Sequence, residues 1–175
     1  MSFLELAGMR HSCRSFRHDP IPDHILQSVL EAARLAPSAV NYQPVLIIVV
    51  GDGELRDSIN SSYEKDWISS APLLLVVCGD HSSAWRRSDG KDYCDMDVAL
   101  AAGFMTLAAG DIGLGSSWIC DFDAMQVSKL LGTPSHIEPS VMLALGYPDD
   151  EGATTSPARE RRKSLDEIVR FGRYV

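Results

Sequence analysis

Apolar residues are spaced along this chain in a way that predicts helices alternating with strands. Between Pro22, which suits a first helical position, and Pro37, which stops a helix, they recur at the interval of one helical face, as Ile25, Leu26, Val29, Leu30 and Ala33. The run VLIIVV at 45–50 is continuous and rich in β-branched residues, which is typical of a strand buried on both faces. A second such strand is expected at 73–77, with a polar, helical stretch between the two strands, and a short helix is expected at 2–9.

The second half of the chain continues the alternation. Residues 97–109 (DVALAAGFMTLAA) are apolar nearly all round, so a helix there must be covered on every side, either at the centre of the domain or at a subunit contact. A Gly-rich turn leading into a strand is expected at 112–119, a helix at 123–131 and a strand at 141–145. The stretch 79–90, rich in Ser, Gly and charge, is expected to be an exposed, mobile loop. Alternation without strict unit spacing favours a mixed α+β sandwich over a doubly wound fold.

Composition narrows the class of protein. The 175 residues, 45% of them apolar, suit one compact domain spanning 1–175. A formal net charge of -8 would repel a phosphate backbone, so we expect no nucleic-acid partner. No run reaches the ~20 apolar residues of a bilayer span, and the N-terminus does not resemble a signal peptide. The four cysteines are scattered without a CxxC pair, which predicts neither a metal site nor a disulfide framework and suits a reducing cytoplasm.

Arg10-His11-Ser12-Cys13-Arg14 is the first segment that could carry chemistry. In an extended segment, Arg10, Ser12 and Arg14 point to the same side. Guanidinium groups are always-charged donors of fixed geometry, so this side would clamp a phosphate or an anionic ring. An ordinary solvated surface explains the same residues, and the segment by itself does not decide between the two.

The segment 36–44 (APSAVNYQP) lies between a predicted helix and a predicted strand. Its two prolines fix the path of the loop, while Ser38, Asn41 and Gln43 offer hydroxyl and amide groups able to bond the edge of a heteroaromatic ring. Plain turn chemistry is the alternative interpretation.

Two later segments are less specific. Residues 113–121 (GLGSSWICD) contain paired glycines that let the backbone approach a flat ligand. Their spacing is not GxGxxG, which disfavours a dinucleotide-binding domain. Residues 159–163 (RERRK) form a cationic cluster in an acidic chain, although runs of this kind are usually solvated.

Together and in this order, these segments resemble the nitroreductase family of flavin mononucleotide (FMN)-dependent oxidoreductases over almost the whole chain. The family opens with a pattern like R-x-S-x-R/K-x-F, here Arg10, Ser12, Arg14 and Phe16. It continues with a turn like A/S-P-S-x-x-N-x-Q-P-W and a late L-G-x-x-x-x-I segment, and it closes with a basic residue before a Leu-led amphipathic end. The resemblance implies a three-layer α+β sandwich, with a central, mostly antiparallel sheet flanked by helices, in an intertwined homodimer with FMN at the subunit interface.

The resemblance also implies roles for single residues. Arg10 and Ser12 would hold the FMN phosphate together with one of two tail arginines, of which Arg162 aligns better. Arg14 would reach the pyrimidine ring, the 36–44 loop of the opposite subunit would cover the ring system, and residues 118–121 would lie along it with a backbone N–H facing N5. The expected FMN-binding residues are Arg10, His11, Ser12, Arg14, Pro37, Ser38, Ala39, Asn41, Gln43, Trp118, Ile119, Cys120, Asp121, Arg161 and Arg162.

The reaction implied is hydride transfer from NADH or NADPH to a small organic acceptor, such as a nitroaromatic or a quinone, by a ping-pong mechanism. The chemistry belongs to the cofactor, so no catalytic acid or base is expected among the side chains. Three alternatives stay open at this point. They are a flavoprotein of the same fold with another reaction (dehalogenation, ring oxidation or consumption of the flavin), a non-catalytic FMN-binding module, and a protein that binds no flavin.

Overall fold

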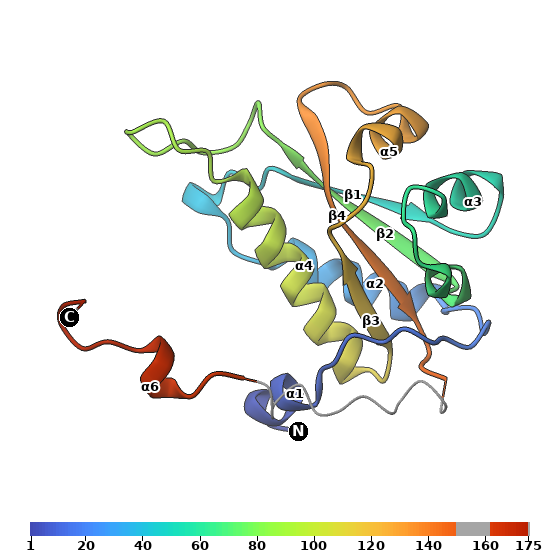
Figure 1. Ribbon diagram of the computed structural model, residues 1–175, viewed down its shortest axis with the longest axis horizontal. Coiled ribbons are helices and arrows are strands. Elements are labelled where there is room, and N and C mark those ends of the chain that lie inside the picture. The colour runs from blue at the N-terminus through green and yellow to red at the C-terminus, as the bar shows by residue number, and fades with distance from the viewer. Residues whose placement is uncertain (150–161, 175) are drawn as a thin grey trace.

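A four-stranded antiparallel sheet lies at the centre of the molecule (Figure 1). The computed structural model describes residues 1–149 and 162–174, and all statements on structure refer to these. In spatial order β1-β2-β4-β3, the strands are β1 (Val45–Val50), β2 (Leu73–Asp80), β4 (Ile137–Gly146) and β3 (Gly115–Ile119).

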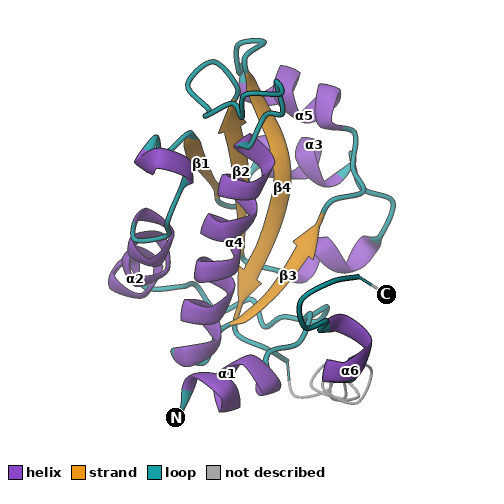
Figure 2. Ribbon diagram, turned by 90° about the vertical axis from the view of Figure 1, so that its left-hand side faces the viewer, coloured by secondary structure: helices purple, strands orange, loops and turns teal. Residues whose placement is uncertain are grey.

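Helices cover both faces of the sheet (Figure 2). On one face lie α2 (Asp23–Arg34) and α4 (Cys94–Asp111), and on the other α3 (Glu54–Asn60) and α5 (Ala124–Leu131). The remaining helices are α1 (Phe3–Met9), which packs against α4, and α6 (Leu165–Ile168), with 3-10 turns at Ala39–Asn41 and Asp66–Ser70. The predicted three-layer α+β sandwich is confirmed.

The two halves of the core meet across β2, whose side chains alternate between them. Leu75 and Val77 are buried against the α2 and α4 layer, whereas Leu74 and Val76 are buried against the α3 and α5 layer. Each buried side chain of this size contributes about 1.5–3 kcal/mol relative to an exposed one. An apolar run without alternation is what a strand covered on both faces requires.

The first predicted strand has the expected bounds, but its predicted burial on both faces is wrong. β1 pairs with β2 alone and lies at the edge of the sheet. Leu46 and Val49, which point to opposite faces, are 46% and 42% exposed. An apolar run indicates a strand, but the place of that strand in the sheet depends on pairing partners far away in the sequence.

Two strands are longer than their apolar runs. β2 extends past Val77 to Asp80, and β4 begins at Ile137 rather than Val141. These extensions pair with each other, Asp80 opposite Ile137, after a register shift. Polar residues are therefore held in the sheet by the neighbouring strand, and the predicted 79–90 loop begins only at His81.

The 97–109 helix is not covered on every side by its own chain, which leaves a subunit contact as the predicted alternative. α4 is buried along the side that faces the sheet and α2. Met96, Leu100 and Phe104, one turn apart, remain 45%, 41% and 39% exposed. One apolar face of α4 is therefore left open by this chain.

The C-terminal segment lies apart from the sheet (Figure 1). All side chains described from 162 to 174 are exposed, including the apolar residues Leu165, Ile168 and Phe171. Among the described helices, none combines the length and apolar character needed to cross a membrane.

Candidate functional site

The segment 10–14 is fastened to the beginning of β3. Ser12 forms a parallel bridge with Ser116, and the Cys13 N–H donates to the Ser116 carbonyl over 3.0 Å. Cys13 is fully buried, and a Cβ at position 115 would lie 2.9 Å from its sulfur, so this close approach requires Gly115. The first and third segments singled out in the sequence therefore lie side by side.

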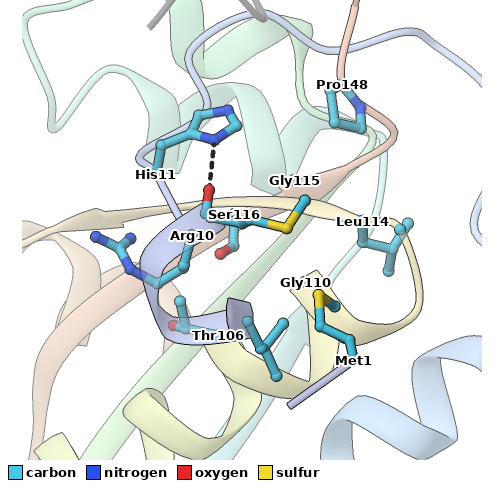
Figure 3. Close-up of a pocket in the computed structure, with 12 residues that line it drawn as sticks. Met1, Arg10, His11, Thr106, Gly110, Leu114, Gly115, Ser116 and Pro148 are labelled. Atoms are coloured by element: carbon cyan, nitrogen blue, oxygen red, sulfur yellow. Dashed lines mark hydrogen bonds between the residues drawn. The ribbon is translucent and has the colours of Figure 1, made fainter. Parts of the chain in front are cut away.

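A pocket opens between α1, the C-terminal half of α4 and this junction (Figure 3). Arg10, His11, Thr106, Gly110 and Ser116 are part of its lining. The rest of the wall is largely apolar and includes Leu6, Met9 and Leu114. The pocket thus joins a cation, an imidazole and hydroxyl groups to an apolar surface, a combination that suits a ligand with a negatively charged group.

His11 brings an unsatisfied ring nitrogen to this pocket. Its Nδ1 lies 3.3 Å from the Met9 carbonyl oxygen, which orients the ring (Figure 3). Its Nε2 is buried and has no hydrogen-bond partner in the part of the chain that the structure describes. Because buried polar atoms are nearly always paired in folded proteins, this nitrogen is a candidate contact for a ligand.

The guanidinium of Arg10 is a second group in this pocket that has no opposite charge beside it in the described chain. Desolvation lowers the pKa of its guanidinium, and the positive charge of Arg162, from the far end of the chain, lowers that pKa further. No carboxylate forms an ion pair with Arg10 among residues 1–149 and 162–174. Like charges that act on each other in this way are unfavourable unless an anion offsets them. The clamp that Arg10 would form with a tail arginine stays a prediction.

Of the other predicted basic residues, one is exposed and one lies outside the described residues. Arg14 is exposed at the end of the segment that carries Arg10. Arg161 lies outside the described residues, as do the first two residues of the cationic cluster 159–163.

The end of β3 supplies a polar and aromatic edge. The Trp118 Nε1–H donates to the Thr106 hydroxyl over 2.7 Å, which orients the indole beside a hollow that Cys120 also lines. Burial raises the pKa of the Cys120 thiol, so its sulfur stays protonated at neutral pH. The side chain of Ile119 is buried in the core, so this residue can face a ligand only through its backbone, whereas Asp121 is exposed.

The loop formed by residues 37–43 has an unusual backbone. Val40, Asn41 and Gln43 have φ values of 53°, 58° and 54°, in the left-handed region that non-glycine residues rarely adopt. Two hydrogen bonds that involve side chains help to hold this shape. The Gln43 N–H donates to Ser38 Oγ over 2.9 Å, and the Gln43 side-chain amide donates to the Asn41 carbonyl over 3.1 Å.

Helix α4 separates this loop from the pocket within one chain. The Ala39 N–H donates to Asp97 Oδ1 over 2.8 Å in the first turn of α4, whereas the pocket is lined by Gly110 near the end of that helix. At 1.5 Å per residue, Asp97 and Gly110 are about 20 Å apart along the axis. In Figure 2, α2, which leads into the loop, and β3 flank α4 on opposite sides. The structure thus brings together the first segment and the third, and leaves the 37–43 loop on the other side of α4.

Three residues of this region were not predicted. Asp97, Thr106 and Ser116 each make a specific contact in the site or its loop. The only available signal was a lone polar residue within an otherwise apolar helix or a glycine-rich strand.

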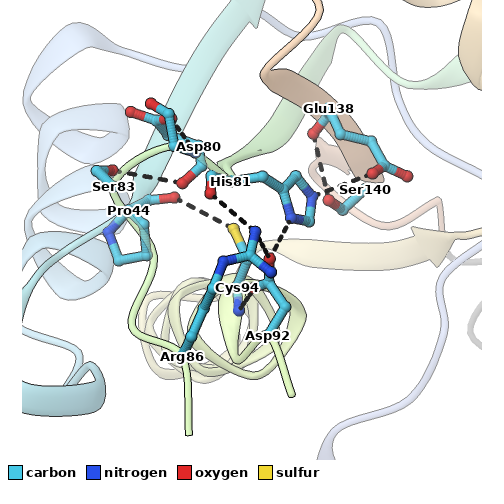
Figure 4. Close-up of polar contacts among 10 residues, drawn as sticks. Pro44, Asp80, His81, Ser83, Arg86, Asp92, Cys94, Glu138 and Ser140 are labelled. Carbon is cyan, nitrogen blue, oxygen red and sulfur yellow. Dashed lines mark hydrogen bonds and ion pairs between the residues drawn. The ribbon is translucent and has the colours of Figure 1, made fainter. Parts of the chain in front are cut away.

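A separate polar cluster holds the loop that joins β2 to α4 (Figure 4). His81 Nδ1 lies 3.1 Å from Asp92 and its Nε2 lies 3.1 Å from Glu138, while Arg86 forms an ion pair with Asp92 at 2.8 Å. Cys94 presents its sulfur within 4.8 Å of ligand-type atoms of His81 and Asp92. Burial raises the pKa of Cys94 to about 12, which keeps the thiol protonated, and the carboxylate is already neutralised by its two basic partners. We therefore interpret the cluster as a structural network.

Comparison with known proteins identifies the family. The model of the nitroreductase family matches residues 7–65 and 60–147. The NADH dehydrogenase of Thermus thermophilus is 30% identical over 174 residues, covering 82% of this chain and 85% of that protein. The iodotyrosine deiodinase of Thermotoga neapolitana is 31% identical over 172 residues, covering 83% and 88%. The NAD(P)H-type FMN reductase of Bacillus subtilis is 29% identical over 159 residues, covering 81% and 64%.

The structural comparison agrees. A crystal structure of a nitroreductase family protein from Clostridium difficile 630 superposes with a TM-score of 0.91 at 34% identity, covering 99% of this chain and 100% of that one. The fold is that of an oxidoreductase family. This chain belongs to the nitroreductase family, which confirms the resemblance found in its sequence.

Proposed function

We propose that this chain is an FMN-dependent oxidoreductase that transfers hydride from NADH or NADPH to a small organic acceptor such as a nitroaromatic or a quinone. The observation that carries the proposal is the pocket that Arg10 and His11 both line, where Arg10 has no ion-pair partner and His11 Nε2 no hydrogen-bond partner in the described chain. The positive charge of Arg162, which lowers the pKa of Arg10, supports it. A phosphate placed there would relieve the repulsion between the two cations and give the imidazole a partner. The residues present therefore fit the phosphate end of FMN.

Each predicted residue has a task of binding or orienting in this proposal. Arg10, Ser12 and Arg162 would bind the phosphate, and Arg14 would place a positive charge at the pyrimidine end of the ring. The 118–121 segment, oriented through the bond of Trp118 to Thr106, would lie along the ring. FMN, when bound, supplies the hydride chemistry itself.

We propose further that the protein acts as a homodimer. The open face of α4 presents Met96, Leu100 and Phe104, and the 37–43 loop presents the exposed side chains of Val40 and Tyr42. Because α4 separates this loop from the pocket of its own chain, the loop can cover a bound ring only if it belongs to a second copy. Sedimentation of the purified protein should give twice the chain mass, with one FMN per chain.

The visible spectrum of the purified protein tests the cofactor. We expect a yellow protein whose melting temperature rises with added FMN, since a ligand specific to the folded state stabilises it. NADH or NADPH should be oxidised when a quinone is added. A colourless protein with an unchanged melting temperature in excess FMN would contradict the proposal.

Substitution of the phosphate clamp gives a sharper test. Arg10→Ala should weaken FMN binding by roughly 1.5–3 kcal/mol, the scale of a hydrogen bond to a charged group, which is about 10- to 150-fold in Kd. Fluorescence titration of FMN measures the change. Arg17→Ala removes an exposed arginine paired with Asp19 and is the matched control, with an affinity close to that of the wild type. Equal affinities of the two variants would remove Arg10 from the site.

Reductive dehalogenation is a second candidate reaction, favoured by the 31% identity to a protein named iodotyrosine deiodinase. Both reactions use the same cofactor site, so they are separated by the acceptor alone. Turnover of chemically reduced enzyme with an iodinated phenol, compared with a quinone, decides between them. Iodide release with no quinone reduction would favour dehalogenation.

A further inference from the structure

Asp97 is a buried carboxylate in α4, whose other buried side chains are apolar apart from Thr106. It is 3% exposed and lies in the first turn of α4. Its Oδ1 accepts the Ala39 N–H over 2.8 Å, and its Oδ2 is buried with no hydrogen-bond partner in the described chain. A buried charge with one partner is expensive, and a small apolar residue would pack at this position without that cost.

Stability of α4 does not account for this carboxylate. The positive end of the helix dipole favours an acid in the first turn, yet Asp95 already lies there and is exposed. The first amide of the helix, that of Cys94, is satisfied by Asp92. The hydrogen bond that remains for Asp97 runs to the 37–43 loop, 58 residues away in the sequence.

That loop needs an anchor outside itself. Its three left-handed residues cost on the order of 1–2 kcal/mol each relative to ordinary backbone. The other side-chain hydrogen bonds of the loop, from Gln43 to Ser38 and to Asn41, lie within it. The bond from Ala39 to Asp97 ties the strained segment to the rigid end of α4, with Val40 and Tyr42 pointing outward.

We propose that Asp97 is a positioning residue, which holds the 37–43 loop in the shape that covers the flavin bound by the second copy of this chain. The inference rests on the proposed function and adds a residue that acts through the loop, on the cofactor of the other subunit. Within one chain, Asp97 lies about 20 Å along α4 from Gly110 in the Arg10 pocket, and its hydrogen bond runs to the loop rather than to the β3 side of that helix.

Three variants of the full-length protein test the hydrogen bond. Asp97→Ala removes the acceptor, and we expect the Kd for FMN to rise about tenfold or more, the factor for one hydrogen bond to a charged group. The visible band of the bound flavin should move toward that of free FMN. Asp97→Asn keeps an acceptor oxygen for the Ala39 N–H and should restore both readouts. Asp111→Ala, at the exposed end of the same helix, is the control for loss of charge.

Mixed dimers separate positioning from a general loss of folding. In a dimer of one Arg10→Ala chain and one Asp97→Ala chain, one site combines both defects, whereas the other combines an intact clamp with an intact loop. We expect half of the sites to bind FMN with wild-type affinity. Two weakened sites and no wild-type site would overturn the proposal, because they would mean that Asp97 acts on its own chain or on folding.

The outcomes also separate this inference from the function on which it rests. If the wild type binds no FMN, both are wrong. If the wild type binds FMN and Asp97→Ala binds it equally well with an unchanged spectrum, the function stands and the positioning role is wrong.

Discussion

Two loops adjoin the first turn of α4, and they are built in opposite ways. The β2–α4 loop, residues 81–93, is closed by its own charges. His81 bridges Asp92 and Glu138, and Arg86 adds a second cation (Figure 4). The 37–43 loop has strained backbone, exposed apolar side chains and one side-chain bond to the rest of the chain.

The difference between them lies in backbone strain and apolar exposure, not in unpaired polar atoms. In the 81–93 loop, Asp92 has two basic partners and His81 two acidic ones among the described residues. Buried polar atoms without a hydrogen-bond partner in the described chain occur at His81 as well as at His11 and Asp97, so they do not separate the two regions. What sets the 37–43 loop apart is its strained backbone and its exposed apolar side chains, which suit contact with a second molecule. The comparison therefore predicts a role in stability for the first loop and in ligand binding for the second.

The largest effect is expected from breaking the charge network. Asp92 accepts the Cys94 N–H over 2.8 Å and is bonded to His81, so Asp92→Ala should cost about 1–3 kcal/mol of unfolding free energy. Urea denaturation measures it. Asp89→Ala removes an exposed carboxylate paired with Arg87 in the same loop and should cost less. Equal losses, or a larger effect on FMN affinity than that of Asp97→Ala, would contradict the division between the loops.

The pH dependence of stability should report His81. Its hydrogen bond to Asp92 raises the pKa of His81 above its ordinary value of about 6.5, with the charges of Asp92 and Glu138 acting in the same direction. A pKa raised in the folded state gives stability that is complete below the unfolded value and is lost as the pH rises through the folded one. Unfolding free energy should therefore fall as the pH is raised from about 6 toward 8.

His81→Gln should flatten that pH dependence. His24→Gln, at an exposed position on α2, is the matched control and should keep the wild-type profile. A profile unchanged by His81→Gln would show that the imidazole carries no such charge.

The smallest effect is expected from relaxing the strained loop. Val40→Gly removes a left-handed cost of about 1–2 kcal/mol and adds about 0.5–1 kcal/mol of chain entropy, so unfolding free energy should stay level or rise by up to about 1 kcal/mol. FMN should bind more weakly because the loop loses its fixed shape. Val49→Gly, on the edge strand, should instead destabilise the protein. A clear loss of stability in Val40→Gly would mean that the backbone there is not strained.

Much of the fold was predictable because its signals are local. The run at 45–50 gave the bounds of β1, and helical spacing gave α2 and α5 within two residues at each end. The edge position of β1 and the pairing of Asp80 with Ile137 were not predictable, since both depend on strands far away in the sequence.

Part of the candidate site was predictable from the sequence and part was not. Residue types at 10–14 and 113–121 indicated an anion and a flat ligand, and the structure places these segments together at Gly115. The bond between Asp97 and Ala39 had no sequence signal, because one buried acid in an apolar run does not reveal its partner.

In the proposed site, the clamp of Arg10 and Arg162 draws on residues far apart in the chain. All four described strands are finished by Gly146, so a polypeptide halted shortly afterwards already has the material for its sheet and most of its core. It would still lack Arg162. We therefore expect such a product to bind the anion more weakly, and to gain less stability from it, than a chain that reaches Arg162.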